Sequence, residues 1–280
     1  MNSSLPVPAP SPVLPDGPGF WSRLGTQLAR GAAAIGAGAS AIGAGATAAW
    51  EAIDVDVRND ITNAPLLGVT SLGPRHRTIR ALPDDGHRPV IFVHGMGGHP
   101  GNFLPMRGWL KVQGRRRSYS VGRPLGGDLT DFSRLLARQI DEVLSVNGLE
   151  GGQVDIVAHS MGGIISRLAL LDVDVVSRVG TLVTLGTPHQ GTQAARWGGT
   201  ACCTELRPGS ESMQALAGQL PWRGPVRLVS FWSEADPFMQ PAGTARVPGA
   251  DNRQLGGLSH TDYLLKRTSW RAVRDALAVD

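Results

Sequence analysis

The sequence predicts an α/β fold in which a mainly parallel central sheet is covered by helices on both faces. Strand and helix patterns alternate through the second half of the 280-residue chain, and this alternation is typical of parallel sheets. Glycine-rich and polar motifs follow the apolar strand patterns directly, as expected where a site forms at the carboxyl ends of strands. Hydrophobic residues make up 41% of the sequence, which is enough apolar material for a substantial core.

The first 50 residues differ in composition from the rest. Residues 1–30 are predicted to form a flexible arm, because closely spaced prolines before position 20 oppose helix formation. They lack the pattern of an ordinary signal peptide, which favours a cytoplasmic or membrane-associated protein. Residues 31–50 are rich in alanine and glycine and form a candidate helix.

Two interpretations of this candidate helix stand side by side. Residues 31–49 carry no charge and are long enough to cross a bilayer, and their small residues would allow close helix contact. The alternative is a surface or partly disordered segment, because each glycine costs a helix about 1 kcal/mol relative to alanine. The oligomeric state stays open.

Apolar periodicity predicts the remaining elements in chain order. The predicted strands are 77–82, 89–93, 154–158, 179–185 and 226–232, and the predicted helices are 131–146 and 161–171. Residues 131–146 place apolar side chains at helical spacing with charges between them, which is typical of an amphipathic helix. The folded domain is therefore expected to span residues 75–280.

Charge and cysteine usage exclude several classes of function. The formal net charge is +4, but the basic residues are scattered, so no nucleic-acid partner is indicated. The one tight run, Arg115 to Arg117, is expected to be solvated on a loop or strand edge, with binding of a phosphate or lipid headgroup as the alternative. Cys202 and Cys203 are adjacent and cannot staple distant segments. With no HExxH or paired CxxC pattern, neither a metal nor a cofactor is predicted.

A nucleophile elbow is predicted at Ser160. The apolar strand 154–158 runs directly into His159-Ser160-Met161-Gly162-Gly163, which begins a helical pattern. Such an elbow requires small residues two positions before and after the nucleophile, and Ala158 and Gly162 meet that requirement. The alternative for Ser160 is a helix cap without chemistry.

A second small-residue turn, His94-Gly95-Met96-Gly97-Gly98, directly follows the strand 89–93. We expect an oxyanion hole here, formed by the backbone N–H groups of Met96 and of Met161, the residue after the nucleophile. The alternative is a tight glycine turn without a ligand.

The motifs HGMGG, AHSMGG and GTPHQGT together resemble the bacterial lipase and esterase branch of the α/β-hydrolases, from about Pro89 to the C-terminus. The segment at about 188–225 is a long insertion that also contains apolar residues, so it is expected to form a small cap or lid, with a structural flap as the alternative. The resemblance implies the α/β-hydrolase fold. It also implies that Thr187, Pro188 and His189 shape the substrate site, where His94, Gly95 and His159 also contribute. His189 is thus not expected to be the general base.

The order serine, acid, histidine selects the other catalytic candidates from the late part of the chain. Asp236 lies at the place that matches the acid loop of these enzymes, and Glu234 is its near competitor. His260 lies in a segment that resembles the histidine loop. Ser160, Asp236 and His260 are therefore the predicted catalytic residues.

These features predict a serine hydrolase that cleaves carboxylic esters, with small-molecule or lipid-like esters as substrates. Two alternatives stay open. One is an acyltransferase, in which an alcohol or lipid acceptor replaces water. The other is a non-catalytic, membrane-tethered interaction module built around residues 31–49. The physiological ester is not determined by the sequence.

Overall fold

The computed structural model describes residue 51 and residues 53–75, 78–124 and 126–278. The compact unit that carries the fold spans Asp54–Asp280. The helix α3, Val55–Thr70, belongs to this unit. The predicted arm and the alanine- and glycine-rich segment, residues 1–50, lie outside the described residues. Within the described ranges, no helix has the length and hydropathy needed to cross a membrane.

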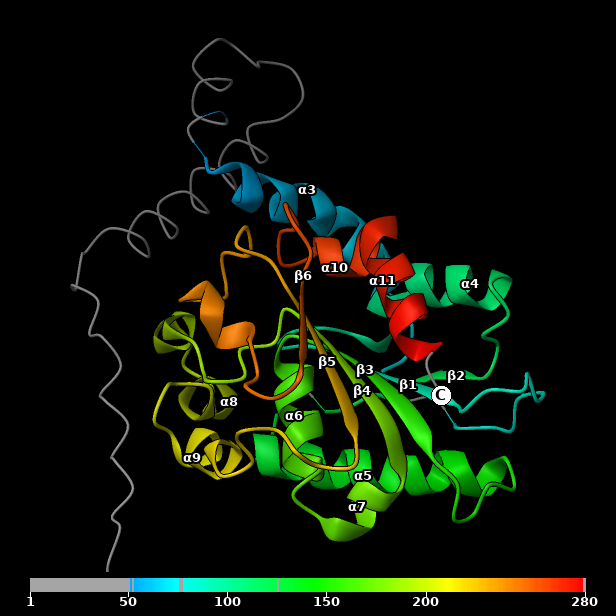
Figure 1. The fold of residues 1–280 in the computed structure, drawn as a ribbon. Helices are drawn as coiled ribbons and strands as arrows, with labels where there is room; N and C mark the ends of the chain where they lie inside the picture. The colour runs from blue at the N-terminus through cyan, green and yellow to red at the C-terminus, as the bar shows by residue number, and fades with distance from the viewer. Residues whose placement is uncertain (1–50, 52, 76–77, 125, 279–280) are drawn as a thin grey trace, which may run out of the picture. The chain divides into compact units, whose positions relative to one another are not determined.

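In the described part of the chain, six parallel strands form one sheet in the order β2-β1-β3-β4-β5-β6 (Figure 1). The strands are β1 Val90–Val93, β2 Ser118–Ser120, β3 Val154–His159, β4 Val179–Leu185, β5 Arg227–Trp232 and β6 Asp251–Gln254. The predicted parallel α/β architecture is therefore confirmed.

Helices cover both faces of the sheet (Figure 1). The long helices are α4 Leu104–Val112, α5 Leu129–Val146, α6 Met161–Ala169 and α11 Arg267–Leu277. The short ones are η1 Pro100–Phe103, α7 Val173–Ser177, η2 Gln193–Trp197, α8 Ala201–Glu205, α9 Glu211–Ala217, η3 Ala242–Ala245 and α10 Asp262–Leu265. Helix α5 begins two residues before its predicted start, because Asp128 caps it by accepting a hydrogen bond from the backbone of Asp131.

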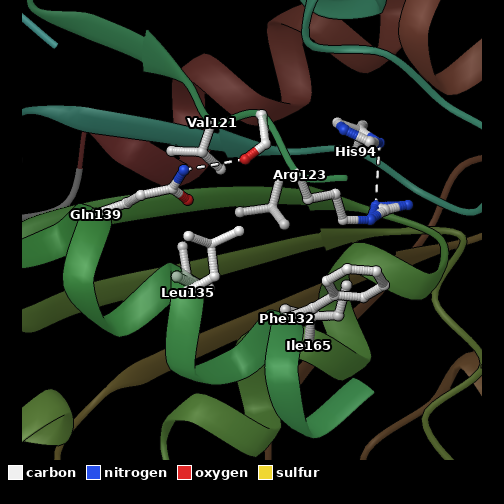
Figure 2. Close-up of a pocket in the computed structure, with 10 residues that line it drawn as sticks. His94, Val121, Arg123, Phe132, Leu135, Gln139 and Ile165 are labelled. Atoms are coloured by element: carbon white, nitrogen blue, oxygen red, sulfur yellow. Dashed lines mark hydrogen bonds between the residues drawn. The ribbon is translucent and has the colours of Figure 1, made fainter. Parts of the chain in front are cut away.

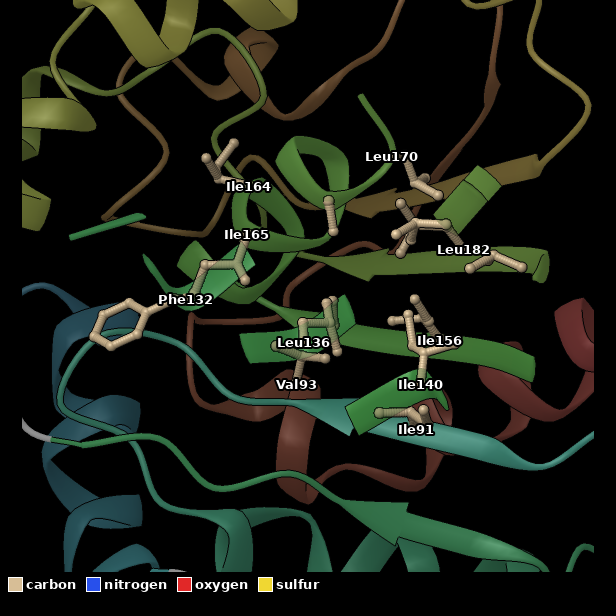
Figure 3. Close-up of a cluster of buried hydrophobic side chains, with 14 of the residues drawn as sticks. Ile91, Val93, Phe132, Leu136, Ile140, Ile156, Ile164, Ile165, Leu170 and Leu182 are labelled. Atoms are coloured by element: carbon tan, nitrogen blue, oxygen red, sulfur yellow. The ribbon is translucent and has the colours of Figure 1, made fainter. Parts of the chain in front are cut away.

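Two hydrophobic cores lie on opposite faces of the sheet because successive strand residues point to opposite sides. Ile91 and Ile156 face the core formed with α5 and α6, which Figure 3 shows in close-up. Phe92 and Val157, their immediate neighbours in sequence, face the core formed with α4 and α11. The central strands are buried on both faces, which explains their continuous apolar runs.

The predicted strand at 77–82 is wrong, since residues 78–82 form no strand. The backbone N–H of Leu82 donates instead to the side chain of Asn147, the C-cap residue that follows α5. The position beside β1 is taken by β2, which has only three residues.

The prediction that the arginine run 115–117 is solvated is also wrong for two of its members. Arg115 is buried, 3.5 Å from the carboxylate of Asp155 in β3, and its guanidinium donates to the carbonyl of Leu277. Arg117 is buried too and pairs with Asp84 at 3.1 Å. Asp155 is fully buried, and a buried carboxylate requires a compensating cation.

Candidate functional site

Ser160 forms the sharp turn between β3 and α6. Its φ of 56° and ψ of −128° make it the only non-glycine residue with positive φ among the described residues. Such a backbone conformation costs about 1–3 kcal/mol and persists where the surrounding structure enforces it. The backbone N–H of Ser160 donates to the carbonyl of Leu185, and its side chain makes no capping bond to α6. The helix-cap alternative therefore does not account for this serine.

Two glycines let other backbone segments approach the elbow. A Cβ on Gly95 would lie 2.7 Å from the Cβ of Ser160, and a Cβ on Gly162 would lie 2.3 Å from the carbonyl oxygen of Val93. Larger side chains at these positions would push the strand β1 and the helix α6 apart. Ala158, which stands where the elbow motif commonly has glycine, is fully buried within β3.

His260 and Asp236 form a buried hydrogen-bonded pair. The imidazole Nδ1 lies 2.9 Å from Oδ2 and 3.1 Å from Oδ1 of Asp236, which also accepts a hydrogen bond from the backbone N–H of Phe238. Glu234, the competitor for the acid position, is exposed. Burial lowers the pKa of His260, but the charge and hydrogen bond of Asp236 outweigh burial, so this pKa is raised above its ordinary value of 6.5.

His159 joins this pair to the elbow. Its Nε2 lies 2.9 Å from the carbonyl oxygen of His260, and the two imidazole rings are 4.6 Å apart between centroids. Burial, and then the neighbouring His260, hold the pKa of His159 well below 6.5. His159 is therefore neutral, and because a carbonyl can only accept, its Nε2 carries the hydrogen. His159, the residue directly before Ser160, thus contacts His260, the partner of Asp236.

The turn that holds Gly95 is fixed by a buried arginine that the sequence analysis missed. The guanidinium of Arg123 donates to the carbonyl of Gly95 and lies 4.9 Å from the ring centroid of Phe132. Figure 2 shows this guanidinium beside His94 at one end of a small cavity. Burial and the charge of Arg123 lower the pKa of His94 to about 3. The position of Arg123 just after β2 could have marked it as a site residue, but β2 itself was not predicted.

The two methionines predicted to supply oxyanion N–H groups differ in environment. The side chain of Met96 is partly exposed, and its Sδ lies 3.4 Å from the Sγ of Cys203 in the helix α8. The side chain of Met161 is buried in the core beneath the elbow. Their backbone roles stay predictions.

The loop after β4 supports the elbow from the side. The hydroxyl of Thr187 donates to the carbonyl of Ser160 at 2.9 Å, and Pro188 is buried next to it. His189 is buried and bonded through Nε2 to Thr184, and burial holds its pKa well below 6.5. Because His260 is the histidine that pairs with Asp236, His189 is not the base candidate. A role for Thr187, Pro188 and His189 in lining the substrate site stays a prediction.

The segment 188–225, predicted as a cap or lid, contains η2, α8 and α9. Arg167 of α6 is fully buried and donates to the carbonyl of Leu216 at 2.7 Å and to the side chain of Gln219 at 3.0 Å. Glu205 of α8 accepts a hydrogen bond from the backbone of Leu129 at the start of α5. The segment therefore packs on α5 and α6. Its role as a lid stays a prediction.

No cluster of three or more histidine, cysteine, aspartate or glutamate side chains suited to a metal ion occurs in the part of the chain that the structure describes. Asp236 and His260, the acid and base candidates, are hydrogen-bonded to each other.

Comparison with known proteins identifies the fold. A family model described as a PGAP1-like alpha/beta domain matches residues 124–201. The mature form of lipase BlEst2 from Bacillus licheniformis has a TM-score of 0.60 at 19% identity, and the match covers 73% of this chain and 99% of that chain.

Two further solved structures are similar. Lipase B from Aspergillus fumigatus has a TM-score of 0.64 at 19% identity, with 73% of this chain and 56% of that chain covered. Phospholipase PlaB from Legionella pneumophila has a TM-score of 0.57 at 16% identity, with 69% of this chain and 60% of that chain covered. The chain therefore has the fold of lipases and esterases of the α/β-hydrolase superfamily, as the motifs predicted.

Proposed function

We propose that this protein is a serine hydrolase that cleaves carboxylic esters. Ser160 is the nucleophile, His260 the general base, and Asp236 the carboxylate that orients the base. The observation that carries the proposal is the contact between His159 and His260, because it brings the hydrogen-bonded Asp236 and His260 pair to the elbow that holds Ser160. The lipase and phospholipase fold neighbours support the same class of reaction.

The protonation pattern of the pair suits this role. Asp236 accepts the hydrogen on Nδ1 of His260, so neutral His260 has an unprotonated Nε2 that can take the hydroxyl proton of Ser160. The Ser160 oxygen then bonds to the ester carbonyl carbon, and the alcohol leaves with the proton that His260 returns. Water repeats the sequence on the acyl-enzyme and releases a carboxylic acid together with free Ser160.

The negative charge that develops on the ester oxygen requires hydrogen-bond donors. In this proposal the donors are the backbone N–H groups of Met96 and Met161, which lie on the two turns that meet at Gly95 and Ser160. Arg123 supports the first turn through the Gly95 carbonyl. It thereby limits the reorganisation of that turn during the reaction.

We further propose that the ester is lipid-like. The partly exposed side chains of Met96 and Phe238 belong to the oxyanion turn and the acid loop, and the ring of Phe238 lies 4.8 Å from that of His260. The apolar side chains of Phe238 beside the pair and of Met96 on the oxyanion turn favour an acyl chain over a charged substrate.

A series of p-nitrophenyl esters of increasing acyl length tests both parts of this proposal. The wild-type protein should hydrolyse them, with a preference for chains longer than acetate, and Ser160→Ala should abolish turnover. Ser269→Ala removes a buried serine of α11, outside the elbow and the acid and histidine loops, and serves as the matched control, expected to retain turnover. Turnover that survives Ser160→Ala contradicts the assignment of the nucleophile, whereas a preference for acetate contradicts the lipid-like substrate.

A further inference from the structure

Helix α3 contacts the histidine loop, although α3 precedes the part of the sequence that carries the hydrolase motifs. Oδ1 of Asp60 accepts two hydrogen bonds from Thr261, from the backbone N–H at 2.8 Å and from the hydroxyl at 2.6 Å. One turn later on α3, the side-chain amide of Asn63 donates to the Thr261 hydroxyl at 2.9 Å and to Asp262 at 3.0 Å. About 200 residues of sequence separate the two partners of each contact.

These contacts fix the peptide that follows His260. The carbonyl of His260 and the N–H of Thr261 belong to the same peptide unit, which is planar. His159 of β3 holds the carbonyl, and Asp60 of α3 holds the N–H. The peptide plane is thus bound on both edges, which limits rotation of the backbone that carries the His260 imidazole.

Ser259, the residue before His260, is held by hydrogen bonds that also lead to α3. The carboxylate of Asp262 accepts a hydrogen bond from the backbone N–H of Ser259 at 3.2 Å while it also accepts from Asn63. The backbone on both sides of His260 is therefore anchored, directly or through Asp262, to α3.

We propose that Asp60 is a positioning residue for the general base, acting through Thr261 to hold the His260 loop over the Ser160 elbow. The proposal rests on the catalytic role of His260 proposed above. Asn63 completes the contact by orienting the Thr261 hydroxyl toward Asp60. The helix α3 is thereby part of the catalytic apparatus rather than a linker ahead of it.

Asp60 also adds negative charge near the base. After burial, which lowers the pKa of His260, and Asp236, which raises it, Asp60 contributes a further raising effect. Other titratable or charged groups also lie around the His260 loop or interact with groups there. They are Asp236, His159, Asp56, Asp262, Tyr263 and Lys266, the last of which pairs with Asp262. Asp60→Asn should consequently lower the pKa of His260.

Two substitutions separate position from charge. Asp60→Asn keeps an acceptor oxygen for Thr261 but removes the charge, so kcat on the pH plateau should stay within about twofold of wild type. The acid limb of its rate profile should move to lower pH. Asp60→Ala removes the acceptor as well and should lower kcat about tenfold or more with little change in KM, because a small displacement of a catalytic group is costly.

The kcat of Asp60→Ala decides the positioning role. An NMR titration of the His260 imidazole, assigned with His260→Gln, in wild type, Asp60→Asn and Asp174→Asn decides the charge effect. Asp174 is exposed on α7, at the end of the sheet away from α3 (Figure 1), and its substitution removes the same charge, so His260 should titrate there as in wild type. A wild-type kcat in Asp60→Ala overturns the positioning role, and an unchanged pKa of His260 in Asp60→Asn contradicts the charge contribution of Asp60. If the wild-type protein cleaved no ester, the catalytic assignment would fail, while the titration would still decide whether Asp60 acts on His260.

Discussion

The close approach of Gly162 to β1 gives the sharpest test of how the elbow is built. In Gly162→Ala the new Cβ would lie 2.3 Å from the carbonyl oxygen of Val93, whereas ordinary contacts begin at 3.4 Å. The helix α6 must therefore move by about 1 Å relative to β1, because the obstacle is backbone and cannot rotate away.

The energetic balance follows from this displacement. Overpacking of a well-packed site costs up to about 3 kcal/mol, and the better helix propensity of alanine returns at most about 1 kcal/mol. The net loss of about 2 kcal/mol corresponds to a melting temperature lower by about 4–8 °C in a domain of this size. A shift of about 1 Å at the nucleophile should reduce kcat about 100-fold.

Gly108→Ala is the matched control. Gly108 lies within the helix α4, and a Cβ there would meet nothing within 4 Å. This substitution should leave activity unchanged and raise stability by up to about 1 kcal/mol. Thermal melts and ester turnover of both variants form the assay. If Gly162→Ala melted and turned over like wild type, the tight elbow described here would be incorrect.

Three further predictions concern protonation. Asp236→Asn should reduce kcat about 10⁴-fold, because the amide no longer holds the productive tautomer of His260. NMR should also show a lower pKa for the His260 imidazole. Near-normal turnover would contradict the role of Asp236 in orienting His260. His94 is buried and neutral with a pKa of about 3, so the stability that it contributes is present above pH 6.5 and is lost as the pH falls from 6.5 toward 3. The melting temperature should therefore fall with pH across that range, and it should fall less steeply in His94→Gln. Equal pH dependence of the melting temperature in both proteins would refute a contribution from His94. Burial raises the pKa of Cys202 to about 11, so iodoacetamide at pH 7.5 should alkylate it slowly in the folded protein and rapidly in denaturant, as mass spectrometry would show; fast labelling when folded would contradict its burial.

The central strands could be predicted from the sequence because burial on both faces makes them continuous apolar runs. The strand β4 was predicted with its observed bounds. The edge strands β2 and β6 could not be found in the same way. Ser118–Ser120 and Asp251–Gln254 are short and largely polar, and their pairing depends on the strands beside them.

Long-range pairing explains the other differences. The burial of Arg115 depends on Asp155, which the fold brings close from 40 positions further along the chain. The contact of Asp60 with Thr261 spans 201 positions, and no local pattern indicates it. The pairing of Asp236 with His260, in contrast, was predicted because each lies in a segment that resembles a catalytic loop, in the expected order after Ser160. Sequence patterns thus located the groups expected to react, but not the groups that hold them.

Covalent labelling with a fluorophosphonate tests the central claim most directly, because this reagent reports an activated serine without requiring the natural substrate. Peptide mass spectrometry of the labelled wild-type protein should find one phosphonylated residue, Ser160, and labelling should be lost in Ser160→Ala and strongly reduced in His260→Ala. A wild-type protein that is folded but not labelled, or a label on another residue that persists in Ser160→Ala, would contradict the account.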